Sequence, residues 1–228
     1  MSIKAVIFDY DGVIADTFMN QYRVMKYISE LAGNRFPYRF PKQLKDDYTE
    51  PFTIMYERCG FSWEHDEHFI RQHFDEFQAA HSHDVRLVHG IDEVIQKLDK
   101  EGYKLGIVTQ NTKSVVRSKL EQCDLATCFN SIMTFEDVAR IKPYPDGIIR
   151  CLFDLGIYSD EAVYVGDMPS DVMTAKAAGT GSISFLGGYG SMKKFKELPK
   201  EAYDYTVFIK KPKQILTFLN ERVFLAKG

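Results

Sequence analysis

Apolar runs and amphipathic segments alternate through most of the chain. Residues 3–8 lack polar alternation, which predicts a strand buried on both faces of a parallel sheet. After residue 85, helical spacing and short apolar runs follow one another. The pattern predicts helices over 91–100, 113–122, 146–155, 169–178 and 213–225, and strands over 103–109, 131–134, 162–166, 182–186 and 205–208, the last at an edge. Such alternation is typical of an α/β fold whose parallel sheet is covered by helices on both faces.

Residues 17–83 follow a different pattern, with helices and loops only. Apolar residues at helical spacing predict helices over 19–31 and 63–80, and a shorter one reaching Met55. Residues 36–51 are expected to form a polar and aromatic connection. We therefore expect one sheet domain interrupted by a helical insertion, which begins just after Asp11 and could serve as a lid.

Composition narrows the class of protein. The chain has 228 residues, 45% of them hydrophobic, so it can bury a core. Its net charge of -3 indicates no basic surface that would bind a nucleic acid polymer or a membrane. We find no apolar stretch of membrane-spanning length and no secretory pattern at the N-terminus. The four cysteines include no Cys-x-x-Cys pair, which favours reduced thiols and a cytoplasmic location.

Two carboxylates follow the first strand at Asp9 and Asp11. Ligand sites in open α/β sheets lie beyond the carboxyl ends of strands. Because two like charges repel there, a cation or a proton must offset them. Alternatively, Asp11-Gly12 forms an ordinary turn after the strand and has no catalytic role.

Three further polar groups follow or lie between predicted strands. Thr109 offers a hydroxyl before free backbone N–H groups, which suits an anionic oxygen, although Asn111 or Thr112 could simply cap the next helix. Asp167 ends another buried strand, and Lys142 lies in a segment that two prolines hold stiff. A nucleophile, an acid, a cation site and a neutralising charge are the groups that phosphoryl transfer requires.

The short motifs together resemble the haloacid dehalogenase superfamily, in its phosphatase branch with an α-helical cap. The resemblance rests on residues 9–14, Thr109, Lys142-Pro143 and residues 166–171, in the order of that family. It implies a Rossmann-like catalytic core of residues 1–14 and 87–228, a helical cap domain of residues 15–86, and Mg²⁺ as cofactor.

The resemblance also implies roles for single residues. Asp9 would be the nucleophile and a magnesium ligand. Asp11 would act as general acid and then base, with its main-chain carbonyl on the metal. Asp167 would be the remaining metal ligand, supported by Asp171 directly or through water.

The phosphoryl group would be held by other positions. Thr109 and the Gln110 backbone would bind its oxygens, and Lys142 would steady Asp9 and the transferred group. The implied function is Mg²⁺-dependent hydrolysis of a small metabolite's phosphate monoester, such as phosphoglycolate, a sugar phosphate or a nucleotide monophosphate, through an aspartyl-phosphate. The protein would be a monomer or a small homo-oligomer.

Two other functions stay open. Sugar phosphomutases of the superfamily share the first motif but carry a histidine where this chain has Gln21, which leaves an isomerase as an alternative. The other alternative is a non-catalytic binding or regulatory protein on the same fold. An aspartate at position 11 favours phosphate esters, because the dehalogenases and phosphonate-cleaving members lack an acidic residue there.

Two patterns have no assigned role. All six histidines fall within residues 65–89, which fits either a zinc site or a solvated helix face. Residues 187–190, Gly-Gly-Tyr-Gly, indicate a turn, and their place after a predicted core strand could bring them to the rim of the site.

Overall fold

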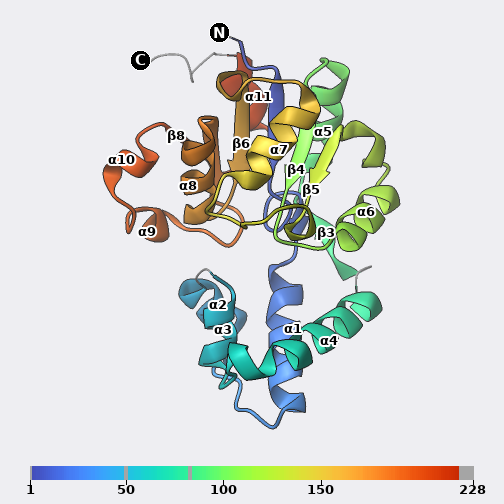
Figure 1. Ribbon diagram of the computed structural model, residues 1–228, viewed down its shortest axis with the longest axis vertical. Helices are drawn as coiled ribbons and strands as arrows, with labels where there is room; N and C mark the ends of the chain where they lie inside the picture. The colour runs from blue at the N-terminus through green and yellow to red at the C-terminus, as the bar shows by residue number, and fades with distance from the viewer. Residues whose placement is uncertain (1, 49–50, 82–83, 221–228) are drawn as a thin grey trace. The chain divides into compact units, whose positions relative to one another are not determined.

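The structure, a computed structural model, describes residues 2–48, 51–81 and 84–220. Two compact units make up the chain: Met1–Asp16 together with Leu87–Gly228, and Thr17–Arg86. The first unit contains the sheet, and the second is helical (Figure 1).

A six-stranded sheet with strand order β5-β4-β1-β6-β7-β8 forms the first unit, and every adjacent pair in it is parallel. Its strands are β1 (Ala5–Phe8), β4 (Lys104–Val108), β5 (Ser131–Met133), β6 (Ala162–Gly166), β7 (Gly181–Phe185) and β8 (Thr206–Ile209). Strand β1 is fully buried, as its unbroken apolar run predicts. The chain adds β4 and β5 on one side of β1, then β6, β7 and β8 on the other, so the strand order reverses at β1, where open α/β sheets bind ligands.

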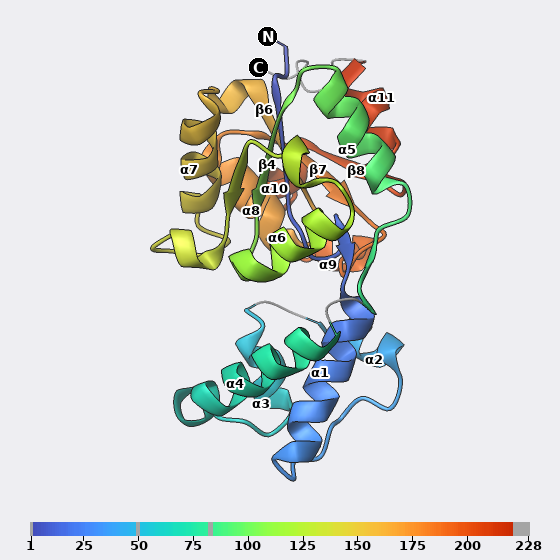
Figure 2. The ribbon, with the colours of Figure 1, turned by 90° about the vertical axis from the view of Figure 1, so that its right-hand side faces the viewer.

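Helices cover both faces of this sheet. They are α5 (Ile91–Lys100), α6 (Lys113–Gln122), α7 (Asp146–Leu155), α8 (Pro169–Ala178), α9 (Met192–Phe195), α10 (Lys200–Tyr203) and α11 (Gln214–Asn220). Helix α7 packs on β4 and β5, and α8 packs on β6 and β7, whereas α5 and α11 pack together on the opposite face (Figure 2). The expected α/β class, a Rossmann-like sheet with an inserted helical cap, is confirmed.

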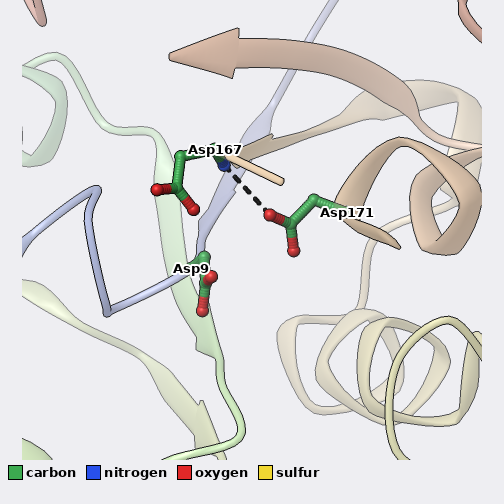
Figure 3. Close-up of side chains that lie close together, drawn as sticks. All are labelled: Asp9, Asp167 and Asp171. Carbon is green, nitrogen blue, oxygen red and sulfur yellow. Dashed lines mark hydrogen bonds between the residues drawn. The ribbon is translucent and has the colours of Figure 1, made fainter. Parts of the chain in front are cut away.

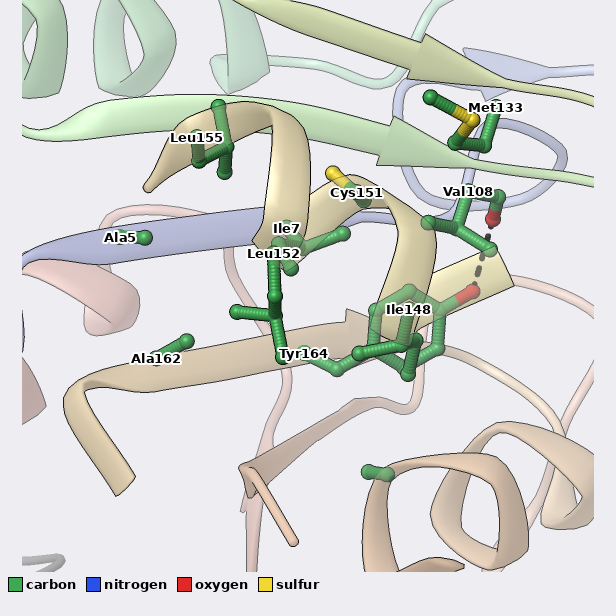
Figure 4. Packing of buried hydrophobic residues seen from close by; sticks show 11 residues of the cluster. Ala5, Ile7, Val108, Met133, Ile148, Cys151, Leu152, Leu155, Ala162 and Tyr164 are labelled. Atoms are coloured by element: carbon green, nitrogen blue, oxygen red, sulfur yellow. Dashed lines mark hydrogen bonds between the residues drawn. The ribbon is translucent and has the colours of Figure 1, made fainter. Parts of the chain in front are cut away.

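One face of α7 forms much of the core against the sheet. Ile148, Cys151, Leu152 and Leu155 recur at helical spacing and are buried against β1, β4 and β6 (Figure 4). Gly106 in β4 allows this close approach, since a Cβ there would overlap the Cys151 sulfur. Packing of α7 therefore holds the strands whose ends carry the polar groups.

The helical unit has a core of its own. It contains α1 (Phe18–Leu31), α2 (Pro41–Asp47), α3 (Thr53–Arg58) and α4 (Trp63–His81). Their inward faces bury one cluster, which includes Val24, Met25, Ile28, Leu44, Met55, Tyr56 and Ile70. Aromatic rings line it, with Phe52 and Trp63 edge to face at 5.2 Å between centroids. The four helices therefore pack on one another through this cluster.

The structure corrects the sequence-based elements in several places. Helix α2 lies within the expected connection of residues 36–51. It begins with Pro41 in its first turn, and Gln43 Oε1 accepts hydrogen bonds from the backbone N–H groups of Arg39 (2.8 Å) and Phe40 (3.0 Å). The short helices α9 and α10 are also additional to the predicted elements, as is a separate two-stranded sheet of β2 (Ala15–Asp16) and β3 (Arg86–Leu87). Of the helix expected over 213–225, residues 221–225 lie outside the described residues.

Two neighbouring isoleucines of α7 test this packing. Ile148 is fully buried and Ile149 is 53% exposed. We expect Ile148→Ala to lower the free energy of unfolding by about 2–5 kcal/mol, because it opens a cavity between α7 and the sheet. The matched control, Ile149→Ala, should lower it by less than about 1 kcal/mol. Urea denaturation followed by circular dichroism measures both, and equal losses would contradict the assigned packing.

Candidate active site

Asp9 stands where strand β1 ends. Its backbone N–H donates to the Val165 carbonyl (2.8 Å), and its side chain is almost fully buried. The chain then turns, since the Tyr10 carbonyl accepts bonds from the N–H groups of residues 13–15, and Gly12 has a φ of 75°. Strand geometry therefore does not continue through Tyr10. The side chains of Asp9 and Asp11 contact different partners as a result.

Lys142 joins two of the acidic groups. Its Nζ lies 2.9 Å from Asp9 Oδ2 and 2.8 Å from Asp171 Oδ1, and its side chain is only 6% exposed. A buried ammonium requires such partners, because an unpaired charge away from water is strongly unfavourable. The lysine therefore holds Asp9 and Asp171 against one shared cation.

Asp167 and Asp171 are connected through the start of α8. Asp171 Oδ2 accepts hydrogen bonds from the backbone N–H groups of Asp167 and Met168, both at 2.9 Å (Figure 3). Asp171 thus satisfies free donors at the N-terminus of α8 while its other oxygen contacts Lys142. Asp167 comes directly after β6, and its Oδ2 accepts a hydrogen bond from the Tyr189 N–H.

Three carboxylates meet at this edge of the sheet. Asp9, Asp167 and Asp171 each offer an oxygen within 4.8 Å of the others, and all three are buried (Figure 3). Among the residues that the structure describes, this is the group of at least three ligating side chains close enough to share an ion. The side chain of Asp11 is not part of it.

Burial makes the negative charge of the cluster unfavourable. It raises the pKa of Asp9 to about 8, against the opposing effect of Lys142. Burial also raises the pKa of Asp167 well above its ordinary value, and the charges of Asp171 and Asp9 add to this effect. A hard divalent cation with oxygen ligands fits such a donor set, since it would stabilise the ionised carboxylates.

The end of β4 supplies a second wall of the site. Thr109 is buried, and its Oγ1 accepts a hydrogen bond from the Asn111 N–H at 3.1 Å. Gln110 lies between them, at the position expected to offer its backbone N–H. Thr112 caps α6, because its side chain accepts from the Val115 N–H, so this residue has the capping role that the sequence left open.

Asp11 contacts the same loop. Asn111 Nδ2 lies 3.3 Å from Asp11 Oδ1 and 3.2 Å from Asp11 Oδ2. Sequence reasoning named Asn111 only as a possible helix cap. The contact was not predictable, because it joins residues one hundred positions apart.

Two further features around the cluster were missed or left open. The buried Tyr164 hydroxyl donates to the Val108 carbonyl (2.8 Å) and lies 3.3 Å from Asp171 Oδ1. A tyrosine within an apolar strand is typical of a core residue, and no local pattern indicates the partner of its hydroxyl group.

The glycine-rich loop 187–190 lies directly against Asp167. A Cβ at Gly188 would overlap the Asp167 carboxylate, and a Cβ at Gly190 would overlap the Asp167 carbonyl.

The sequence model of the haloacid dehalogenase-like hydrolases matches residues 6–185. The chain belongs to this family. The match contains the ends of β1, β4 and β6 and the lysine between them, so the family and the clustered groups occupy the same part of the chain. The resemblance drawn from the short motifs is thereby confirmed, and with it the expectation of a hydrolytic enzyme.

Named relatives and solved structures agree with this family. Pyrophosphatase PpaX from Bacillus cereus is 32% identical over 184 residues, covering 79% of this chain and 82% of the relative. A proposed phosphoglycolate phosphatase from Lactobacillus plantarum has a TM-score of 0.81 at 21% identity, over 95% of this chain and 99% of that one. CbbY from Rhodobacter sphaeroides, solved with phosphate, has a TM-score of 0.76 at 21% identity, over 96% and 99%. The two structures share the fold of this chain.

The hydroxyl of Tyr164 gives a test of the buried polar network. Burial raises the pKa of this phenol well above its ordinary value, so it stays protonated and donates. Tyr164→Phe should lower the free energy of unfolding by about 1–3 kcal/mol, because the Val108 carbonyl loses its buried donor. Tyr158→Phe removes a hydroxyl from a residue that is 78% exposed and should change stability by less than about 0.5 kcal/mol. Guanidinium denaturation compares the two, and equal effects would overturn the structural role of the Tyr164 hydroxyl.

Proposed function

We propose that this protein is a Mg²⁺-dependent phosphatase that hydrolyses the phosphate monoester of a small metabolite through an aspartyl-phosphate on Asp9. One observation carries the proposal: Asp9 is a buried carboxylate, held at 2.9 Å by Lys142, within a cluster of three aspartates at one edge of the sheet. Membership in the hydrolase family supports it.

In the first step, Asp9 is the nucleophile. A carboxylate oxygen of Asp9 bonds to phosphorus while the bond from phosphorus to the ester oxygen breaks. The electron pair of that bond stays on the leaving oxygen, which takes a proton from the Asp11 carboxyl, so the alcohol leaves neutral. Lys142 keeps Asp9 in place and offsets charge on the phosphoryl group.

In the second step, water replaces Asp9. Asp11, now ionised, takes a proton from the water whose oxygen bonds to phosphorus. The bond between phosphorus and Asp9 breaks, which releases inorganic phosphate and restores the carboxylate. The Thr109 hydroxyl and the Gln110 backbone N–H are the groups proposed to hold the phosphoryl oxygens in both steps.

The carboxylates of Asp9 and Asp167, with the main-chain carbonyl of Asp11, are the proposed metal ligands. When bound there, Mg²⁺ supplies positive charge that offsets the repulsion between Asp9 and the substrate dianion. Asp171 is proposed as a support, because its two oxygens already accept bonds from Lys142 and from the backbone at the start of α8. The donor set consists of oxygens alone, as Mg²⁺ prefers.

The relatives favour a second substrate class. PpaX proteins are named pyrophosphatases, and inorganic pyrophosphate differs from a phosphate monoester only in that its leaving group is itself phosphate. The same attack by Asp9 would serve both. A panel that contains pyrophosphate, phosphoglycolate, sugar phosphates and nucleotide monophosphates separates the two classes by their kcat/KM values.

Replacement of the nucleophile is the direct test. Asp9→Asn should lower kcat on p-nitrophenyl phosphate by at least about 10⁴-fold, because an amide cannot form the acyl phosphate. Asp160→Asn makes the same chemical change at an exposed carboxylate before β6 and should leave kcat within about twofold. Turnover retained in a folded Asp9→Asn protein would remove Asp9 from the proposed role.

Metal dependence is tested by activity and by stability. Excess EDTA should abolish turnover, and Mg²⁺ in excess over the chelator should restore it. Mg²⁺ at one hundred times its Kd should also raise the free energy of unfolding by about 2.7 kcal/mol in the wild type. Asp167→Asn should reduce this stabilisation, measured by denaturation at several Mg²⁺ concentrations. Undiminished turnover in EDTA would contradict the proposed cofactor.

A further inference from the structure

We propose that Asn111 is a positioning residue for the acid and base chemistry of Asp11. The inference rests on the proposed function, because it assumes that Asp11 gives a proton to the leaving group. Its basis is the contact between Asn111 Nδ2 and both carboxylate oxygens of Asp11, at 3.2 and 3.3 Å.

The orientation of the Asn111 amide follows from its other partner. Asn111 Oδ1 accepts a hydrogen bond from the Thr112 N–H at 2.8 Å. A backbone N–H can only donate, so the oxygen of the amide must face Thr112. The NH₂ group must therefore face Asp11, and a donor is presented to the carboxyl group.

One nitrogen placed between two oxygens suits a group that changes its protonation state. When one oxygen of Asp11 carries the proton, the other still accepts from Asn111 Nδ2. When Asp11 has lost the proton, the same donor stabilises the carboxylate. The side chain is thus held at one place before and after the proton moves.

Asn111 also connects Asp11 with the phosphate-binding group. Its backbone N–H donates to Thr109 Oγ1 at 3.1 Å, so this oxygen accepts from the loop and its own hydrogen is free to point elsewhere. One residue therefore orients a hydroxyl proposed to bind the phosphoryl group and the carboxyl proposed to protonate the leaving oxygen. Small displacements of such groups have large effects on rate.

The test compares two substrates that differ in their need for an acid. Phenyl phosphate releases phenolate, which leaves much faster with a proton, whereas p-nitrophenyl phosphate releases a resonance-stabilised anion that needs none. For Asn111→Ala, kcat/KM on phenyl phosphate should fall on the order of 10²-fold. On p-nitrophenyl phosphate it should fall by less than about threefold, because formation of the acyl phosphate no longer depends on Asp11.

Two further variants distinguish loss of the Asn111 amide donor from a structural change of the loop. Asn111→Asp keeps an oxygen for the Thr112 N–H but loses the donor, and it should show the same selective loss on phenyl phosphate. Thr112→Ala removes the cap of α6 without changing the amide, and it should not alter the ratio of the two kcat/KM values. The melting temperature of each variant shows that it is folded.

The outcomes separate this inference from the proposed function. A wild-type protein with no more turnover than Asp9→Asn contradicts the proposed function. An active wild type whose Asn111 variants lose both substrates equally, or neither, overturns the role of Asn111 and leaves the nucleophile untouched. The same selective loss in Thr112→Ala would also overturn it, because the effect would then belong to the loop and not to the amide.

Discussion

The contact of Lys142 with Asp9 and Asp171 is the constraint on which the site depends. One buried ammonium, 2.9 and 2.8 Å from the two carboxylates, connects the end of β1, the segment before α7 and the first turn of α8. Asp171 extends the connection through its second oxygen, which accepts from the backbone N–H of Asp167. All three side chains are buried, so loss of Lys142 would leave both carboxylates without their shared cation away from water. The same cation therefore joins the aspartate that follows β1 to the one at the start of α8.

The sheet decides which residues can take part. Strand β1 lies between β4 and β6, and its register aligns Phe8 with Ile107 on one side and with Val165 on the other. The residues that follow these strands therefore leave the sheet side by side at the same edge. The sequence predicts this much, since unbroken apolar runs followed by Asp9, Thr109 and Asp167 indicate parallel strands ending in polar groups. Helical spacing also predicted α5, α6, α7 and α8. Helices α5 and α7 each bury an apolar face, whereas α8 also buries Asp171 and Thr174.

The sequence could not predict contacts that depend on tertiary distance. Lys142 was singled out for its stiff surroundings, but its pairing with Asp171 requires the position of α8 relative to the segment before α7. The bond from Asn111 to Asp11 and the packing of Gly188 on Asp167 likewise join residues that no short pattern relates. Helix α2 was missed for a local reason: its N-cap position holds Phe40 and not the Ser, Thr, Asp or Asn that usually marks a helix start. The Gln43 side chain bonds back to the N–H groups of Arg39 and Phe40.

The two acidic residues of the first motif differ because their surroundings differ. Asp9 is buried, which raises the pKa of its carboxyl group to about 8, and the Lys142 ammonium at 2.9 Å opposes this rise. Asp11 is only partly buried, and the amide of Asn111 can serve both of its protonation states. Two chemically identical side chains two residues apart therefore meet different groups: Asp9 contacts the Lys142 ammonium, and Asp11 contacts the Asn111 amide.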